Sequence, residues 1–354
     1  MDSLNRCFLL LLLLAGMTAC SDDEEQLPVV PMAERRLPAA EYEPAVAVLM
    51  HEPGTEVQGY GGLTKVFDVE AMQQEHRAYV ELLRKNGIHV YEAGSLLEGV
   101  SLSGLKGFYF TRDQSITTLR GHVLCRMANS QRLQEPELIR QCYRRMGRSV
   151  CYEVKGTDSR LEGGDYLPFG TLAFIGEGAR TNRAAIEELM EADAFGHDTV
   201  VVVKDRLRHS LLMHLDTYFN IIDRDLVTLP ASRVAAAGDS PRYVAVDVFA
   251  RGVGERAYRQ LAADVSLVTF LQERGVAIVE LTADDETNYV SNFLCIAPRH
   301  IVAIDRMSDA TRSELEALGV TVELVKLDEL TEGAGAAHCM TQVLSRAAVE
   351  HFSY

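Results

Sequence analysis

The chain has 354 residues, a hydrophobic fraction of 47% and a formal net charge of −16 at pH 7. A chain this acidic repels the phosphates of nucleic acid and of anionic lipid, which argues against both as partners and is compatible with a cationic substrate. The five cysteines beyond residue 20 are scattered and form no CxxC pair, which excludes a zinc ribbon and a disulfide framework.

The first twenty residues are typical of a secretory signal. Arg6 supplies a positive charge, and residues 8–14 are an unbroken apolar run. The 12 residues from the start of this run to position 19 are too few to span a bilayer of about 30 Å as a helix. Met-Thr-Ala at 17–19, followed by Cys20, resembles the lipobox of bacterial lipoproteins, in which the cysteine is acylated and becomes the mature N-terminus.

We therefore expect residues 1–19 to be a lipoprotein signal peptide and Cys20 to be lipidated. An ordinary signal peptide with a chance cysteine is the alternative. Ser21 stands where an aspartate often holds lipoproteins at the inner membrane, and residues 21–25 resemble acidic tags of surface lipoproteins in some Gram-negative lineages. The expected location is the bacterial cell envelope, lipid-anchored, at the outer membrane on its periplasmic or surface face.

Residues 26–44 contain four of the ten prolines and show no apolar period. Polar segments rich in proline act as semi-extended spacers. We expect residues 20–44 to form a lipidated N-terminus and a flexible tether. The remaining residues, 45–354, are enough for one large domain, and we expect a single catalytic domain there.

A short pattern of helix, glycine and strand recurs at Gly87, Gly275 and Gly319. Each glycine follows an amphipathic stretch, where a helix end needs a left-handed residue, and alternating apolar residues follow it. This repetition favours an α/β fold. The expected strands are 46–50, 107–111, 172–175, 200–203, 293–297 and 301–304, and the expected helices are 69–85, 135–146, 182–190, 255–273 and 310–317.

Four polar motifs follow predicted strands, and they contain Asp113, Glu162, Arg180, His214 and Asp216. If the segment around His214 is extended, His214 and Asp216 point to the same face. Each motif has a structural interpretation as a surface ion pair, an acidic turn or a structural hydrogen bond. Imidazole and carboxylates also suit a metal ion, but the set holds only one histidine and no paired-histidine spacing.

Cys339 follows a run of small residues, 333–338, that begins Gly-Ala-Gly. A flexible loop of this kind can bring a cysteine close to a ligand. A lone cysteine is more often a small buried hydrophobe, so Cys339 by itself remains only a candidate nucleophile.

The order of the motifs resembles the arginine deiminases, which belong to the guanidino-group-modifying (amidinotransferase) superfamily. The order is Phe-Thr-Arg-Asp at 110–113, Leu-Glu-Gly-Gly-Asp at 161–165, Gly-Glu-Gly-Ala-Arg-Thr at 176–181, His-Leu-Asp-Thr at 214–217 and His-Cys-Met at 338–340. The resemblance covers nearly the whole globular chain. It implies a five-bladed, pseudo-symmetric α/β propeller, the pentein fold, which would account for the repeated units.

The resemblance also implies roles for eight residues, and it implies no metal or organic cofactor. The roles are Cys339 as nucleophile, His214 as general acid and base, Asp113 and Asp216 as the carboxylates that grip a guanidinium, Glu162 as the carboxylate beside the histidine, Arg132 and Arg180 as ligands of a substrate α-carboxylate, and Phe110 as a ring that lines the pocket.

The chain departs from the family pattern in three places. Gly107 stands where an asparagine usually helps to hold the α-carboxylate, and the loop 333–337 lacks the arginine that usually precedes the cysteine. Only about ten residues separate Leu97 from Phe108, where typical members carry a helical insertion, so we expect a compact form.

We expect hydrolysis of L-arginine to L-citrulline and ammonia. Hydrolysis of methylated arginines, amidino transfer to an amine, and a silent guanidino-binding lipoprotein are the alternatives, and a metal-dependent hydrolase ranks last. A buried guanidinium requires carboxylates, which Asp113, Asp216 and Glu162 supply. The same carboxylates disfavour a thiolate in the empty site, so the sequence predicts a Cys339 that ionises when the cationic substrate binds.

Overall fold

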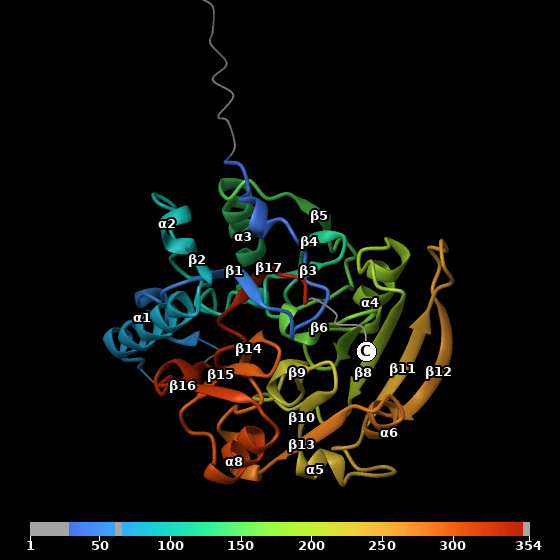
Figure 1. Ribbon diagram of the computed structural model, residues 1–354. Helices are drawn as coiled ribbons and strands as arrows, with labels where there is room; N and C mark the ends of the chain where they lie inside the picture. The colour runs from blue at the N-terminus through green and yellow to red at the C-terminus, as the bar shows by residue number, and fades with distance from the viewer. Residues whose placement is uncertain (1–27, 61–65, 350–354) are drawn as a thin grey trace, which may run out of the picture.

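The computed structural model describes residues 28–60 and 66–349, and five sheets lie around a common centre in it (Figure 1). The predicted five-bladed α/β propeller is confirmed, and each sheet is called a blade below. The blades are β3 (Ser115–Thr118), β4 (Gly121–Leu124) and β5 (Val150–Glu153); β6 (Tyr166–Phe169), β7 (Leu172–Glu177), β8 (Thr199–Asp205), β11 (Val244–Ala250) and β12 (Arg259–Ser266); β9 (Asn220–Asp223), β10 (Leu226–Pro230) and β13 (Ala277–Leu281); β14 (Leu294–Ala297), β15 (His300–Ile304) and β16 (Thr321–Val325); and β17 (Gln342–Arg346), β1 (Ala45–Met50) and β2 (His89–Glu92).

Every blade repeats one pairing scheme. A central strand pairs antiparallel with one neighbour and parallel with the other, as β4 does with β3 and β5. The same scheme holds for β7, β10, β15 and β1. In the last blade β17 pairs with β1, so strands from the two ends of the chain close the ring (Figure 1).

A helix precedes the outer parallel strand of each blade, because a parallel pair needs a crossover. These helices are α1 (Val69–Lys85), α3 (Glu135–Arg145), α4 (Arg183–Glu191), α6 (Leu267–Gln272) and α8 (Asp309–Ala317), and the shorter α2 (Ala93–Leu96), α5 (Ala231–Val234) and α7 (Ala283–Thr287) lie between them. The predicted repeat is confirmed, since Gly87, Gly275 and Gly319 follow α1, α6 and α8 with φ of 78°, 70° and 77°.

The helix α1 illustrates how the sequence produces these elements. The Asp68 side chain accepts a hydrogen bond from the backbone N–H of Ala71, which caps the first turn. Met72, Tyr79 and Leu83 lie on one face and are buried in the same apolar cluster as strand β1. Burying one such side chain contributes about 1.5–3 kcal/mol, so the helix is held mainly by this face.

Most of the predicted elements are confirmed. Strands expected at 46–50, 172–175, 200–203, 293–297 and 301–304 are β1, β7, β8, β14 and β15, and helices expected at 69–85, 135–146, 182–190 and 310–317 are α1, α3, α4 and α8.

The strand predicted at 107–111 is wrong. This stretch forms consecutive turns, with hydrogen bonds from the N–H of Phe110 to the carbonyl of Gly107 and from Asp113 to Phe110. Its aromatic side chains are buried by packing and not by strand pairing. A short apolar run is typical of a buried strand, but it also occurs in a buried turn, as it does here.

The helix predicted at 255–273 is wrong over its first half. Residues Arg259–Ser266 form the edge strand β12, which pairs with β11, and the helix α6 begins only at Leu267. The strand is largely exposed and carries no apolar face with a helical period, so tertiary pairing with β11 decides its conformation.

The tether predicted at 20–44 begins outside the described residues, and its last part is not a spacer. Glu34 and Glu41 are buried, Glu34 contacts Arg148 at 2.9 Å, and Ala40 forms a bridge with Phe169. The 3₁₀ helix η1 (Met32–Glu34) belongs to this segment. Buried ion pairs therefore extend the domain to the N-terminal side of residue 45.

All five cysteines from 125 to 339 are free thiols, as the sequence predicted. No helix within 28–60 and 66–349 has the length and apolarity that crossing a bilayer requires. The predicted signal peptide and Cys20 lie outside the described residues.

Candidate active site

The site is built from the five segments that lead into the first strand of each blade. Because the blades surround one centre, these entry segments meet there (Figure 1). They carry Asp113 before β3, Glu162 before β6, His214 and Asp216 before β9, Asn292 before β14, and Cys339 before β17.

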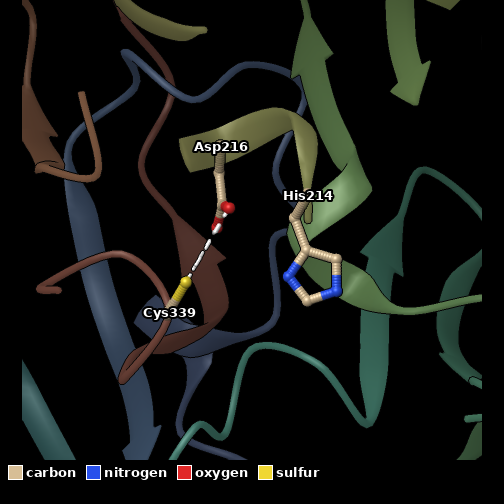
Figure 2. A group of neighbouring side chains, drawn as sticks. All are labelled: His214, Asp216 and Cys339. Atoms are coloured by element: carbon tan, nitrogen blue, oxygen red, sulfur yellow. Dashed lines mark hydrogen bonds between the residues drawn. The ribbon is translucent and has the colours of Figure 1, made fainter. Parts of the chain in front are cut away.

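The Cys339 thiol lies against Asp216 (Figure 2). Its Sγ is 3.5 Å from Oδ2 and 3.7 Å from Oδ1 of Asp216, and 3.2 Å from Nδ2 of Asn292. The residue is only 3% exposed. The structure thus brings Cys339 and Asp216 together, and their catalytic roles stay predictions.

Burial raises the pKa of the Cys339 thiol well above its ordinary value. The carboxylates of Asp216 and Asp113 raise this pKa further, and the hydrogen bond from Asn292 opposes them. The thiol is therefore protonated at neutral pH in the empty site, because its negative form would face other negative charges.

His214 stands beside Asp216 on the same entry segment, just before the 3₁₀ helix η6 (Leu215–Thr217) (Figure 2). Its Nε2 lies 2.8 Å from Oε2 of Glu162, and its Nδ1 lies 3.6 Å from Oδ1 of Asp113. Burial alone would lower the pKa of His214, but Asp113 and Glu162 outweigh it and raise the pKa to about 9. The ring is an imidazolium at neutral pH.

Glu162 is fully buried and precedes the 3₁₀ helix η5 (Gly163–Asp165). Burial would raise the pKa of its carboxyl, but His214 and Arg180 hold it well below the usual range. Arg180 donates from Nη1 to both carboxylate oxygens at 3.2 Å, and the N–H of Ala128 donates to Oε1 at 2.9 Å. Glu162 is an anion that fixes the histidine.

A small residue after Glu162 lets the two entry segments approach each other. A Cβ on Gly164 would lie 2.8 Å from Nδ1 of His214, closer than side chains tolerate. Gly164 of the motif at 161–165 therefore makes room for the imidazole ring beside the glutamate.

One carboxylate oxygen of Asp113 accepts a hydrogen bond, and the other is open, with no donor among the described residues. Oδ2 accepts from Nη1 of Arg132 at 2.7 Å, while Oδ1 has no hydrogen-bond partner among the described residues. The open oxygen is the one that faces His214. An unpartnered buried carboxylate oxygen suits a cationic donor that arrives with the substrate.

Arg132 is placed differently from its predicted role. Its guanidinium donates to Asp113, to Glu135 at 2.9 Å and to the carbonyl of Gly107 at 2.9 Å, and its side chain is 2% exposed. A Cβ at Gly107 would lie 2.5 Å from its Nε, so the glycine makes room for this arrangement. A contact between Arg132 and a substrate carboxylate would require one of these bonds to break.

Phe110 lies beside the loop that precedes the nucleophile. A Cβ on Gly335 would lie 2.8 Å from its ring and 3.1 Å from Sγ of Cys339. Phe110 stacks on Tyr109 with ring centroids 4.1 Å apart. Phe110 therefore lies close to Cys339, and its role as a ring that lines the substrate pocket stays a prediction.

Sequence reasoning assigned no role to Asn292, His338 or Asp165, which complete the site. Asn292 contacts the thiol, and Nδ1 of His338 lies 2.7 Å from Oδ2 of Asp216. Oδ1 of Asp165 accepts the N–H of Leu215 at 2.9 Å and so holds η6. Asp165 and His338 lie within motifs that the sequence singled out, and Asn292 directly precedes the predicted strand 293–297. The sequence does not indicate which side chains these polar residues contact.

Two groups of side chains have the spacing of metal ligands. They are His214, Asp216 and Cys339, and Asp113, Glu162 and His214, whose nearest donor atoms all lie within 4.8 Å of one another. In each group one carboxylate already faces a hydrogen-bond donor: Glu162 faces His214, and Asp216 faces His338. This donor set fits a guanidinium, which brings several N–H groups, better than a bare cation.

Comparisons with known proteins agree with this geometry. A family model described as arginine deiminase matches residues 100–346, a range that contains every residue of the site. The arginine deiminase of Halobacterium salinarum is 27% identical over an alignment of 322 positions, which covers 68% of this chain and 65% of the relative. That of Lactococcus lactis subsp. lactis is 28% identical over an alignment of 324 positions, which covers 84% of this chain and 77% of the relative. The chain thus spans just under two thirds of the first relative's length.

Solved structures show the same fold. DDAH from Pseudomonas aeruginosa, in complex with citrulline, has a TM-score of 0.62 at 16% identity and covers 84% of this chain and 99% of that one. The N-terminal domain of ArgZ, a cyanobacterial arginine dihydrolase, has a TM-score of 0.65 at 17% identity and covers 85% and 98%. The family model matches well over half of the chain, so the protein belongs to the arginine deiminase family.

Proposed function

We propose that this protein hydrolyses the guanidinium group of L-arginine, giving L-citrulline and ammonia. The observation that carries the proposal is the placement of the Cys339 thiol and the His214 imidazolium among the carboxylates of Asp113, Asp216 and Glu162. This arrangement provides a nucleophile, an acid and a negatively charged cradle for one planar cation.

The substrate guanidinium binds between Asp113 and Asp216. The open Oδ1 of Asp113 and the carboxylate of Asp216 accept its N–H groups in place of water. The bound positive charge then offsets the carboxylates that keep the Cys339 thiol protonated, so the thiol ionises beside its target.

The chemistry proceeds in two halves. The Cys339 sulfur bonds to the guanidinium carbon, His214 gives a proton to the departing nitrogen, and the C–N bond breaks to release ammonia. Water then attacks the thiouronium carbon and loses a proton to His214. The C–S bond breaks, which frees the cysteine and leaves a ureido product.

The test is release of citrulline and ammonia from arginine by the purified protein. Cys339→Ala should abolish both products, while Cys151→Ala, which removes an exposed free thiol, should leave them unchanged. Turnover that survives in Cys339→Ala would contradict the assignment. Methylarginines, agmatine and a peptide with C-terminal arginine should be assayed in parallel to define the substrate.

We infer that Arg180, and not Arg132, makes the main contact with the substrate α-carboxylate. Its side chain is 20% exposed, whereas Arg132 is enclosed by Asp113, Glu135 and Gly107. Arg180→Gln should raise KM for arginine more than KM for agmatine, which lacks the carboxylate. Equal effects on both substrates would argue against the contact.

We also infer that the protein is a compact family member and a lipoprotein of the outer membrane. Only turns and irregular segments lie between α2 and β3, which supports the compact form. The charge, apolar run and small residues before Cys20 support acylation of that cysteine. Cys20→Ser should abolish labelling by palmitate in bacterial cells, while Cys7→Ser, inside the signal, should retain it.

A further inference from the structure

Glu41 is a buried carboxylate in the segment that the sequence had assigned to the tether. It is 2% exposed, and Oε2 accepts from Nη2 of Arg346 at 2.6 Å while Oε1 lies 3.4 Å from Nη1 of Arg112. Burial would raise the pKa of Glu41, but Arg112 and Arg346 hold it well below the usual range. The N-terminal segment therefore inserts a fixed negative charge into the interior.

His338 lies between this charge and the active site. Its Nδ1 is 2.7 Å from Oδ2 of Asp216, and because a carboxylate only accepts, the proton of this bond belongs to Nδ1. Its Nε2 is 3.8 Å from Oε2 of Glu41 and has no hydrogen-bond partner among the described residues. The ring is completely buried, so no water screens these contacts.

The chain of contacts ends at the thiol. The oxygen of Asp216 that accepts from His338 is also the one that lies 3.5 Å from Sγ of Cys339. The same carboxylate is proposed above to bind the guanidinium. Its orientation therefore decides both the field at the sulfur and the direction in which the substrate is held.

We propose that Glu41 is a positioning residue of the active site, which acts through His338 to fix the Asp216 carboxylate against the Cys339 thiol. The effect on turnover rests on the proposed function, whereas the effect on the thiol does not. Through Glu41, the N-terminal segment thereby contacts the active site and is not only a connection to the anchor.

Charged and titratable groups from several elements take part in this chain of contacts or lie against it. Arg112 contributes Nε, 3.5 Å from the carbonyl of His338, and Arg346 comes from β17. Asp216 comes from η6, and Cys339 follows His338 directly. The two arginines balance the two carboxylates, so loss of Glu41 leaves an unbalanced positive charge and removes the carboxylate that faces Nε2 of His338.

The experiment measures the pH dependence of Cys339 alkylation by iodoacetamide, followed on the Cys339 peptide by mass spectrometry, together with arginine turnover. Glu41→Gln keeps the shape of the side chain and removes its charge. The matched control is Glu43→Gln, on the same segment, because Glu43 is also buried but pairs with Arg36. Thermal unfolding of each variant shows whether it is folded at the assay temperature.

In Glu41→Gln, a loosened Asp216 should lower the alkylation midpoint by about half a pH unit to one unit. The value of kcat/KM should fall roughly ten- to hundred-fold, as for a misplaced catalytic group. Glu43→Gln should match the wild type in both measurements. A wild-type midpoint and wild-type turnover in folded Glu41→Gln would overturn the proposal.

His338→Asn provides a second arm that removes no carboxylate. The shorter amide can still donate to Asp216 but has no atom facing Glu41, so it should reproduce the midpoint of Glu41→Gln. Wild-type behaviour of His338→Asn would also overturn the proposal, because the effect would not pass through the histidine. If the wild-type protein does not turn over arginine, the proposed function fails, and the alkylation midpoints still decide the role of Glu41.

Discussion

Asn292 holds the nucleophile at both its backbone and its side chain. Nδ2 donates to Sγ of Cys339 at 3.2 Å, while Oδ1 accepts the backbone N–H groups of Cys339 at 3.1 Å and Ala336 at 2.8 Å. Nδ2 also lies 3.1 Å from the carbonyl of Asp216. One amide thus ties the entry segments of three blades together at the sulfur.

Asn292→Ala should lower both stability and turnover. It leaves two backbone N–H groups buried without an acceptor, which costs on the order of 2–4 kcal/mol, and it frees the cysteine loop. Denaturant unfolding and kcat measure the two effects. Asn288→Ala, at the end of α7, is the control and should change neither quantity appreciably.

The free enzyme should have an unreactive thiol. Burial and the carboxylates of Asp216 and Asp113 raise the pKa of Cys339, so the midpoint for alkylation without substrate should lie above 9.0. Asp216→Asn removes the nearest negative charge and should move the midpoint to lower pH. A midpoint below about 7 in the wild-type protein would exclude ionisation driven by the substrate, since that value lies below an ordinary cysteine.

Stability should fall as the pH rises from 6.5 to about 9. The folded-state pKa of His214 is about 9, above its ordinary 6.5, so the folded protein holds a proton that the unfolded chain releases. The stabilisation is complete below pH 6.5 and is lost as the pH passes through 9. It is on the order of 3 kcal/mol, because the pKa rises from 6.5 to about 9 and each pH unit corresponds to about 1.4 kcal/mol.

Unfolding free energies at pH 6 and pH 9.5 measure this loss, and His214→Gln should show a smaller difference between the two. His300→Gln is a suitable control, because His300 also faces a carboxylate, Glu323, at 2.8 Å but at the surface. An equal loss in the wild type and in His214→Gln would mean that other groups cause the pH dependence.

The repeated unit of helix, glycine and strand was predictable because it is local, whereas the five-bladed propeller followed from the family resemblance. A helix end, a left-handed glycine and a strand produce the same sequence pattern wherever they occur, as at Gly87, Gly275 and Gly319. The hairpin of β11 and β12 was not predictable, because β12 has an exposed surface and is a strand only through its pairing with β11. The turns at 107–111 were misread for a related reason, since burial alone does not distinguish a packed turn from a strand.

The site was predictable from its motif order, which identified the residues at the centre but not their partners. Nothing in the sequence indicated that Arg132 is enclosed by Asp113 and Glu135, or that Asn292 touches the thiol. The contact between Glu41 and His338 could not be predicted, because the proline-rich sequence around Glu41 is typical of a spacer. Long-range pairings of this kind depend on the closed ring of blades.

The small residues before Cys339 should be required for packing and not for flexibility. A Cβ on Gly335 would lie 2.8 Å from the ring of Phe110 and 3.1 Å from the thiol sulfur, so Gly335→Ala must push one of them aside. Turnover should fall about ten-fold or more, because the sulfur leaves its position against the substrate carbon. Gly94→Ala is the control, since a Cβ there meets nothing within 4 Å.

If the ring of Phe110 is the obstacle, a smaller side chain should relieve it. The double variant Gly335→Ala/Phe110→Leu should then lose less activity than the sum of the two single losses, since residues in contact are not additive. Strict additivity would place the clash at the sulfur and not at the ring. Unchanged turnover in Gly335→Ala would instead mean that the loop moves freely, and the close contact between the loop and Phe110 would have no catalytic role.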